Sequence, residues 1–239
     1  MKNRVFLIIL VLTISGLVAN TNTASKPTSP GKQNATQNSH PSITTHEDDA
    51  GRKEQKAIKR FAGYVSRKGD KLIFKVAHGK PVVLLDDPHD NDSYCRFIFV
   101  NFLGQIGYYL VEEERYELSQ YRAINSKNGK QKILEDLPVI SPDKKRIAVA
   151  SLGVDSDSKY NGIFFYRLSG DSLRTEKVFL EDDVPDQERW GPSDAHWIDN
   201  KTVEFTKNVP LPESHGMNFT KSPMVARWKY NSWYISEKK

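Results

Sequence analysis

From Phe61 onward the sequence alternates short apolar runs with turn-forming residues, and this pattern predicts β-strands. A sustained hydrophobic period of about 3.6 residues, which a helical domain would need, does not occur in this region. Short strands separated by frequent turns are typical of an all-β sandwich, barrel or propeller. The expected strands are Phe61–Ser66, Lys71–Val76, Pro81–Leu85, Cys95–Phe102, Ile106–Val111, Glu117–Ile124, Gln131–Leu134, Arg146–Ser151, Gly162–Leu168, Thr175–Leu180, Thr202–Thr206, Met224–Tyr230 and Ser232–Ser236.

The most informative stretch is Ile140–Ser151, which reads as a tight turn followed by a strand. Pro142 presets the backbone angle that the second position of a type I turn requires, and Ser141 and Asp143 can hydrogen-bond forward to the backbone. The run Arg146–Ala150 is apolar and partly β-branched, which favours a strand that is buried on both faces.

These residues resemble the hairpin signature of TolB-like bacterial β-propeller repeats, Ser-Pro-Asp-Gly-Lys-x-apolar-Ala-apolar. Lys144 stands where that family prefers glycine, and Ile140 stands where it often has an aromatic residue. The resemblance covers about a dozen residues and implies a propeller blade. It implies no particular function, because propeller blades support many unrelated activities.

Two further segments match this hairpin and indicate an internal repeat. Ser66–Phe74 aligns with it and places Gly69 in the turn, and Trp197–Phe205 aligns with it and places Asp199 there. The copies are unequally spaced along the chain, so the sequence leaves closure into a ring open.

A second landmark is a glycine-centred turn that recurs between later strand candidates, at Gly79, Gly129 and Gly170. Successive turns are 50 and 41 residues apart, which is the length of a four-stranded blade. Asn128 together with Gly129 is a strong hairpin signal, because both turn positions require positive φ. We therefore predict an all-β fold, a propeller-like array of about four four-stranded antiparallel blades.

Residues 1–19 are expected to be a signal peptide. Lys2 and Arg4 precede the apolar run Val5–Val18, which is short for a membrane span and has the length typical of a secretory signal. We expect cleavage after Ala19 or Ala24, which would leave no stable membrane span. An uncleaved N-terminal membrane anchor is the alternative.

Residues 20–56 are expected to form a disordered tether, because Asn, Thr, Ser, Pro and Gln dominate their first half and almost nothing in that half is apolar. The charged segment Glu47–Arg60 fits either a short helix or a continuation of the tether. The predicted β-propeller-like domain follows and covers residues 57–239.

Charge and metal-binding patterns exclude several classes of partner. The net charge is +5, from 35 basic and 30 acidic residues. The sequence lacks the clusters of basic residues that nucleic-acid-binding proteins have, so we expect no nucleic-acid partner. Cys95 is the only cysteine, so no internal disulfide can form, and its apolar strand predicts a small buried side chain. The acidic loop Asp86–Asp92 lacks the turn glycine and the distal glutamate of a calcium-binding EF-hand loop, so we expect no metal site.

The candidate ligand-binding residues are Trp190, His196 and Trp197. They lie in one segment that reads as a loop, and aromatic faces of this kind stack on carbohydrates and peptides. In the alternative interpretation, Trp197 is a core residue at the start of a blade strand and Trp190 packs over it.

The sequence contains no nucleophile elbow, no phosphate-binding glycine loop and no zinc-binding motif, and we expect no cofactor. We predict an exported, periplasmic or secreted binding protein whose partner is a protein or a glycan. The alternative is a hydrolase that acts on a carbohydrate or a peptide through loop carboxylates which the sequence does not single out. A third possibility is an incomplete propeller that another copy or another protein completes, because open blade edges invite pairing.

Overall fold

The computed structural model describes residues 44–238 apart from 90–91, 155–158, 181–188 and 212–217. The expected signal peptide, and residues 20–43 of the expected tether, lie outside the described residues. Within the described part of the chain, no helix is both long enough and apolar enough to span a bilayer.

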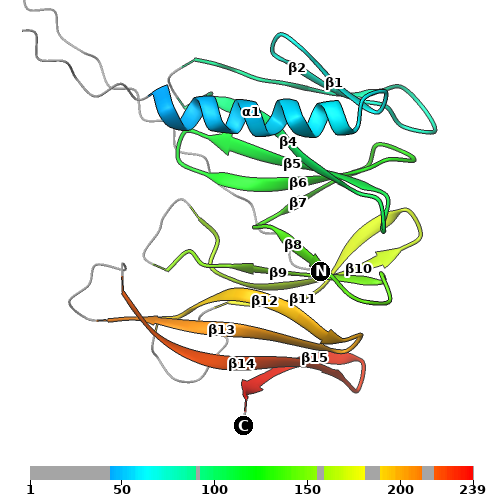
Figure 1. The fold of residues 1–239 in the computed structure, drawn as a ribbon. Helices are drawn as coiled ribbons and strands as arrows, with labels where there is room; N and C mark the ends of the chain where they lie inside the picture. The colour runs from blue at the N-terminus through cyan, green and yellow to red at the C-terminus, as the bar shows by residue number, and fades with distance from the viewer. Residues whose placement is uncertain (1–43, 90–91, 155–158, 181–188, 212–217, 239) are drawn as a thin grey trace, which may run out of the picture. The chain divides into compact units, whose positions relative to one another are not determined.

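The strands form four antiparallel sheets that follow one another along the chain, named blades 1 to 4 here (Figure 1). Within each blade consecutive strands pair side by side. Blade 1 contains β1 (Val65–Lys68), β2 (Lys71–Phe74) and β3 (Val82–Leu85); blade 2 contains β4 (Cys95–Leu103), β5 (Tyr108–Arg115), β6 (Ser119–Asn125) and β7 (Gln131–Leu134); blade 3 contains β8 (Pro138–Ile140), β9 (Arg146–Ser151), β10 (Gly162–Ser169) and β11 (Ser172–Phe179); blade 4 contains β12 (Gly191–Asp199), β13 (Thr202–Pro210), β14 (Phe219–Lys229) and β15 (Ser232–Glu237).

The predicted all-β, propeller-like array is confirmed, with one correction. Blade 1 has three strands, whereas the other three blades have four each. Among the described residues no strand of blade 1 pairs with a strand of blade 4, so strand pairing does not close the array into a ring.

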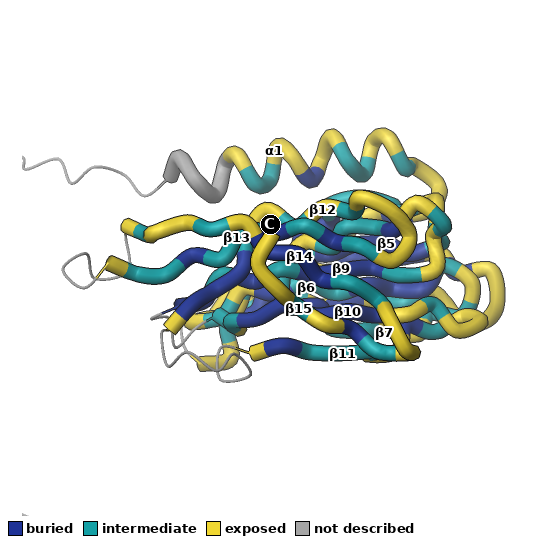
Figure 2. Tube along the Cα trace, turned by 90° about the horizontal axis from the view of Figure 1, so that it is seen from below, coloured by how far each residue is buried: buried dark blue, intermediate teal, exposed yellow. Residues whose placement is uncertain are grey.

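The segment that precedes β1 is a helix, and for this reason it supplies no further strand to blade 1. Helix α1 (Thr44–Arg60) is rich in charged residues, poor in β-branched ones, and packs along β4 (Figure 1). Buried and half-buried residues alternate with exposed ones along the helix (Figure 2). Of the two interpretations of residues 47–60, the structure shows the helix, and the expected domain boundary at residue 57 falls inside it. Ala57 and Ile58 of the helix, together with Phe61, pack against the apolar cluster between blades 1 and 2.

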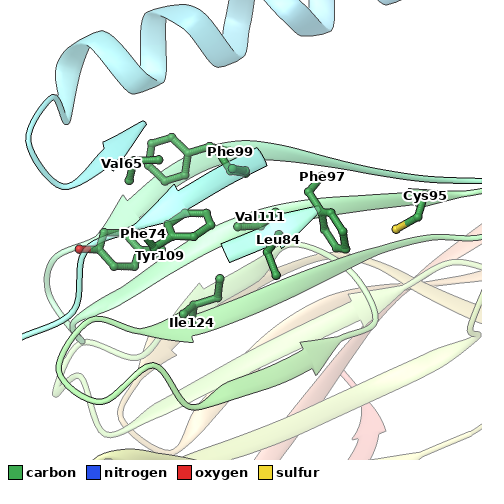
Figure 3. Close-up of a cluster of buried hydrophobic side chains, with 10 residues drawn as sticks. Val65, Phe74, Leu84, Cys95, Phe97, Phe99, Tyr109, Val111 and Ile124 are labelled. Atoms are coloured by element: carbon green, nitrogen blue, oxygen red, sulfur yellow. The ribbon is translucent and has the colours of Figure 1, made fainter. Parts of the chain in front are cut away.

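Neighbouring blades stack through apolar clusters. Phe74 of blade 1 and Phe99 of blade 2 pack in the first cluster, with ring centroids 6.0 Å apart (Figure 3). Strand β9 contributes to two clusters, because Ile147 and Val149 face blade 2 while Ala148 faces blade 4. All three side chains are fully buried, as expected for a strand that is covered on both faces.

The turn before β9 has the form that its sequence predicts. The Lys144 amide donates to the Ser141 carbonyl at 2.9 Å, which closes the turn around Pro142 and Asp143. The Ser141 hydroxyl donates to the Asp143 carboxylate at 2.7 Å, and this carboxylate also accepts the Lys145 amide at 3.1 Å. Lys144 has a φ of 60°, in the left-handed region that favours glycine.

The other predicted turn residues also lie in hairpin turns. Gly69, Gly129 and Gly170 have φ values of 56°, 72° and 57°, so each uses the conformation for which glycine is suited. Asp199 accepts the Lys201 amide at 2.7 Å in the turn between β12 and β13. The first-hairpin turns of blades 3 and 4 also meet, because the Asp143 amide donates to the Asn200 side chain at 2.9 Å.

Strand β12 corrects the sequence interpretation, which treated residues 190–197 as a loop. The pattern was misleading because Gly191 and Pro192 are typical turn residues and polar residues follow them. Pairing of β12 with β13 is interrupted by bulges, and Asp194 has a φ of 55°. Strand β8 was not expected, because three residues are too short to show a period.

Candidate functional site

The residues that the sequence nominated do not converge on one site. Trp190 is 1% exposed and packs in the apolar cluster between blades 3 and 4, with its ring 6.3 Å from that of Phe205. The Trp197 indole donates to the Val139 carbonyl at 2.9 Å and meets Trp233 edge-to-face at 5.8 Å. Both tryptophans therefore belong to the packing between blades.

His196 lies apart from the two tryptophans and is exposed. It is the cross-strand neighbour of Glu204 on β13, and its Nε2 atom lies 3.6 Å from that carboxylate. Lys238 also reaches Glu204, at 2.7 Å. These contacts make a surface cluster on blade 4 in which Lys238 already compensates the charge of Glu204.

A pocket of about 650 Å³ opens between blades 3 and 4. It lies where the β10–β11 hairpin and the β14–β15 hairpin turn on the same side of the array (Figure 1). Its lining consists of Arg167, Leu168, Ser169, Arg174, Thr175, Glu176, Trp228 and Asn231.

Strand pairing places three arginines in a row across blade 3. Arg146 on β9 pairs with Arg167 on β10, and Arg167 pairs with Arg174 on β11. Directly paired residues lie on the same face of an antiparallel sheet, and the Arg146 side chain meets Trp228 of blade 4. All three side chains are therefore directed toward blade 4.

The first arginine of the row is fully compensated. Arg146 Nε lies 2.7 Å from the Glu176 carboxylate, and its guanidinium lies 4.4 Å from the ring centre of Trp228. The Trp233 indole donates to the same carboxylate at 2.9 Å. Glu176 is thus already occupied by two donors, and its charge is balanced by Arg146.

The other two arginines are exposed and uncompensated. No described carboxylate lies within ion-pair distance of Arg167 or Arg174. Like charges that face each other across two strands destabilise a sheet. A bound anion would remove this repulsion, because a guanidinium binds carboxylates and phosphates through paired hydrogen bonds. Ser169 and Asn231 add a hydroxyl and an amide group at the rim.

A second pocket, of about 590 Å³, lies between α1 and blades 1 and 2, but its main charges are used internally. Arg67 bridges Glu54 at 2.8 Å and Asp86 at 2.7 Å. These carboxylates accept the amides of Phe99 and Phe97 at 2.8 and 2.9 Å. Burial alone would lower the pKa of Arg67, but the two carboxylates outweigh it and raise that pKa.

Other titratable groups have structural surroundings. Burial raises the pKa of the Cys95 thiol, which keeps it protonated, as a small buried side chain requires. Burial also raises the pKa of Glu135, partly offset by the hydrogen bond that the Tyr166 hydroxyl donates to it. Within the described residues, no group of three or more His, Cys, Asp and Glu side chains is placed to hold a metal ion.

Sequence reasoning did not find the arginine pair, although a signal for it was present. The sequence places a turn at Gly170, and a two-residue turn made by Gly170 and Asp171 fixes the register of both strands. Counting outward from that turn brings Arg167 opposite Arg174. The pocket itself was not predictable from this pairing, because blade 4 forms its other wall.

The fold and the pocket together define an array of stacked antiparallel blades with a basic cleft between the last two. No protein-family model matches the chain, and no curated protein matches it. Among solved structures, the N-terminal domain of Nup159 is similar with a TM-score of 0.35 and 9% identity, over 73% of this chain and 47% of that chain.

A structure of S. cerevisiae Dbp5 bound to Nup159, Gle1, IP6 and ADP gives a TM-score of 0.36 and 9% identity, over 73% of this chain and 46% of that chain. The chain spans less than half the length of the structures that it matches. A likeness this distant supports no inference about function.

Proposed function

We propose that this protein is a binding protein that holds an acidic group of its partner in the pocket between blades 3 and 4. One observation carries the proposal: Arg167 and Arg174 lie side by side at an open pocket, and no described carboxylate compensates them. Each guanidinium can bind a carboxylate with two parallel hydrogen bonds, which gives both affinity and orientation. The rigid blades supply the fixed geometry that such recognition requires.

The test is a calorimetric titration of the whole chain with tri-glutamate as the probe. Replacing both arginines, Arg167→Gln with Arg174→Gln, should weaken binding at least about tenfold, because each charge-assisted hydrogen bond contributes roughly 1.5–3 kcal/mol. Added salt should weaken binding to the unmodified protein as well.

The matched control removes the same charge from another hairpin, through Lys68→Gln with Lys71→Gln in blade 1. This variant should bind tri-glutamate as the unmodified protein does. Equal affinity for all three proteins would rule out the pocket as the binding site.

We also propose that the chain is exported to the periplasm after removal of a signal peptide, and that its hairpins derive from TolB-like repeats. The charged start followed by the apolar run Val5–Val18 supports export. The turn at Ser141 supports descent from TolB-like repeats, because Lys144, at the position where that family prefers glycine, adopts the left-handed conformation that favours glycine. Mass measurement of the protein from a periplasmic fraction should show an N-terminus at residue 20 or 25; a full-length protein in the membrane fraction would contradict cleavage.

A further inference from the structure

The last hairpins of blades 1, 2 and 3 touch one after another, which the sequence repeat alone did not reveal. Between blades 1 and 2, the Ala77 amide donates to the Ser126 carbonyl at 2.9 Å, and the His78 amide donates to the Lys127 carbonyl at 2.7 Å. These contacts join the β2–β3 hairpin to the β6–β7 hairpin through the backbone.

Similar contacts join the last hairpin of blade 2 to that of blade 3. The Asn125 and Asn128 side chains donate to the Asp171 carbonyl at 3.3 and 3.4 Å, and Lys127 pairs with the Asp171 carboxylate at 3.3 Å. Lys132 of β7 donates to the Thr175 hydroxyl at 3.1 Å. Because Thr175 lines the arginine pocket, this contact connects the blade 2 hairpin to that pocket.

The pocket links the last hairpin of blade 3 to that of blade 4, because its opposite wall includes Asn231 in the β14–β15 hairpin. We call residues 78–80, 127–132, 167–175 and 228–231 the hairpin edge. It contains seven basic residues and one acidic residue, and that acidic residue, Asp171, is paired with a lysine of the same edge. The basic residues are Lys80, Lys127, Lys130, Lys132, Arg167, Arg174 and Lys229.

The tertiary structure thus gathers positive charge that is dispersed along the sequence. The whole chain has a net charge of only +5, and the cations of the hairpin edge come from four segments that lie far apart in the chain. Stacked repeats commonly present such extended surfaces, to which each unit contributes one contact.

We infer that the hairpin edge binds an extended acidic polypeptide, with one of its carboxylates in the pocket between blades 3 and 4. The inference rests on the proposed function of that pocket and extends it to the other blades. A polypeptide fits because its carboxylates match the cations, while its amides and carbonyls match the polar groups of Asn128, Ser169 and Asn231. A small anion would use only the pocket.

The experiment compares tri-glutamate with an oligomer of about twelve glutamates, which spans roughly 40 Å when extended. The unmodified protein should bind the long oligomer at least about tenfold more tightly than the short one, because contacts along one chain reinforce each other. Removing cations remote from the pocket, through Lys80→Gln with Lys130→Gln, should abolish most of this advantage and leave the affinity for tri-glutamate unchanged.

The outcomes separate the two proposals. If the Lys80→Gln/Lys130→Gln variant binds the long oligomer as tightly as the unmodified protein, the hairpin edge is refuted while the pocket stands. If tri-glutamate binding does not depend on Arg167 and Arg174, the proposed function itself fails.

Two controls test specificity. The Lys68→Gln/Lys71→Gln variant loses the same amount of charge outside the hairpin edge. If it loses as much affinity for the long oligomer as the Lys80→Gln/Lys130→Gln variant, the attraction is diffuse and the inference is overturned. An oligogalacturonate of the same charge should bind at least about tenfold more weakly than the long peptide, because it lacks backbone amides. Equal affinity for the sugar would overturn the assignment to a polypeptide.

Discussion

Lys144 is the residue where the chain departs most plainly from the TolB-like hairpin that it resembles. Its φ of 60° places the backbone in the left-handed region that favours glycine, although a lysine stands there. A side chain with a Cβ atom in this region is strained by about 1–2 kcal/mol. The hydrogen bonds that Ser141 and Asp143 make across the turn hold Lys144 in this conformation.

Replacing Lys144 by glycine should therefore stabilise the protein. We expect Lys144→Gly to raise the free energy of unfolding by about 1 kcal/mol, since relief of strain exceeds the entropy that glycine gains in the unfolded chain. Urea unfolding followed by tryptophan fluorescence measures this change. Lys145→Gly is the matched control and should lower stability, because its φ is not positive; a loss of stability in both variants would contradict the argument.

Residue identity alone was a poor guide to the candidate site. Trp190 and Trp197 attract attention in the sequence, but large aromatic side chains are also what a blade interface needs, and the structure uses both tryptophans in that way. Arg167 and Arg174 look like ordinary surface residues until strand pairing places them opposite each other. The two arginines indicate a binding site only because strand pairing brings them together. Neither arginine indicates such a site by itself.

At the scale of elements, β4 shows how the edge strand of blade 2 is covered. An edge strand exposes unpaired amides, which favour unwanted pairing. Here the Glu54 carboxylate from α1 accepts the Phe99 amide, and the Asp86 carboxylate accepts the Phe97 amide. Arg67 holds both carboxylates, so the helix and blade 1 together cover this edge.

Removing this arginine should be costly. Arg67→Ala leaves two largely buried carboxylates without a counter-charge, and breaking a buried ion pair costs about 3 kcal/mol. We expect a loss of that size in chemical denaturation experiments. Glu54→Gln should cost clearly less, because the amide oxygen still accepts the Phe99 amide. Equal losses in the two variants would show that Arg67 contributes packing rather than charge.

Strands were predicted correctly where neighbouring residues mark their ends, and were missed where only pairing with a distant segment makes them strands. The bounds of Gln131–Leu134 and Arg146–Ser151 agree with β7 and β9, because clear turn residues flank both strands. The strand β12 was missed because its sequence carries turn residues and polar side chains, and only pairing with β13 makes it a strand. Tertiary contacts override local propensity in such segments.

At the scale of the whole molecule, each blade packs mainly on its neighbours in the chain. Blade 4 is attached to blade 3 through Trp233, whose ring stacks on Phe165 at 4.0 Å and whose indole donates to Glu176. In stacked repeat proteins, stability is approximately a sum of unit and interface contributions. The loss of one interface should therefore affect one end of the array more than the other.

Trp233→Ala tests this expectation. The large-to-small change should destabilise the attachment of blade 4 by about 3–5 kcal/mol. Hydrogen exchange should accelerate in β12–β15 and stay slow in β4–β6. Tyr234→Ala, in the neighbouring exposed position, should leave exchange unchanged. Uniform acceleration over all blades after Trp233→Ala would show that the array unfolds as a single unit.

The sequence by itself determined the features that arise from neighbouring residues: the all-β class, the repeated hairpins, the tight turns and the two-sided burial of β9. These follow from turn chemistry and apolar periodicity, which act over a few residues. The tertiary structure alone decided which hairpins touch, that a helix covers the edge of β4, and that Arg167 and Arg174 share a pocket with blade 4. Such features depend on contacts between segments far apart in the chain, and local patterns do not encode them.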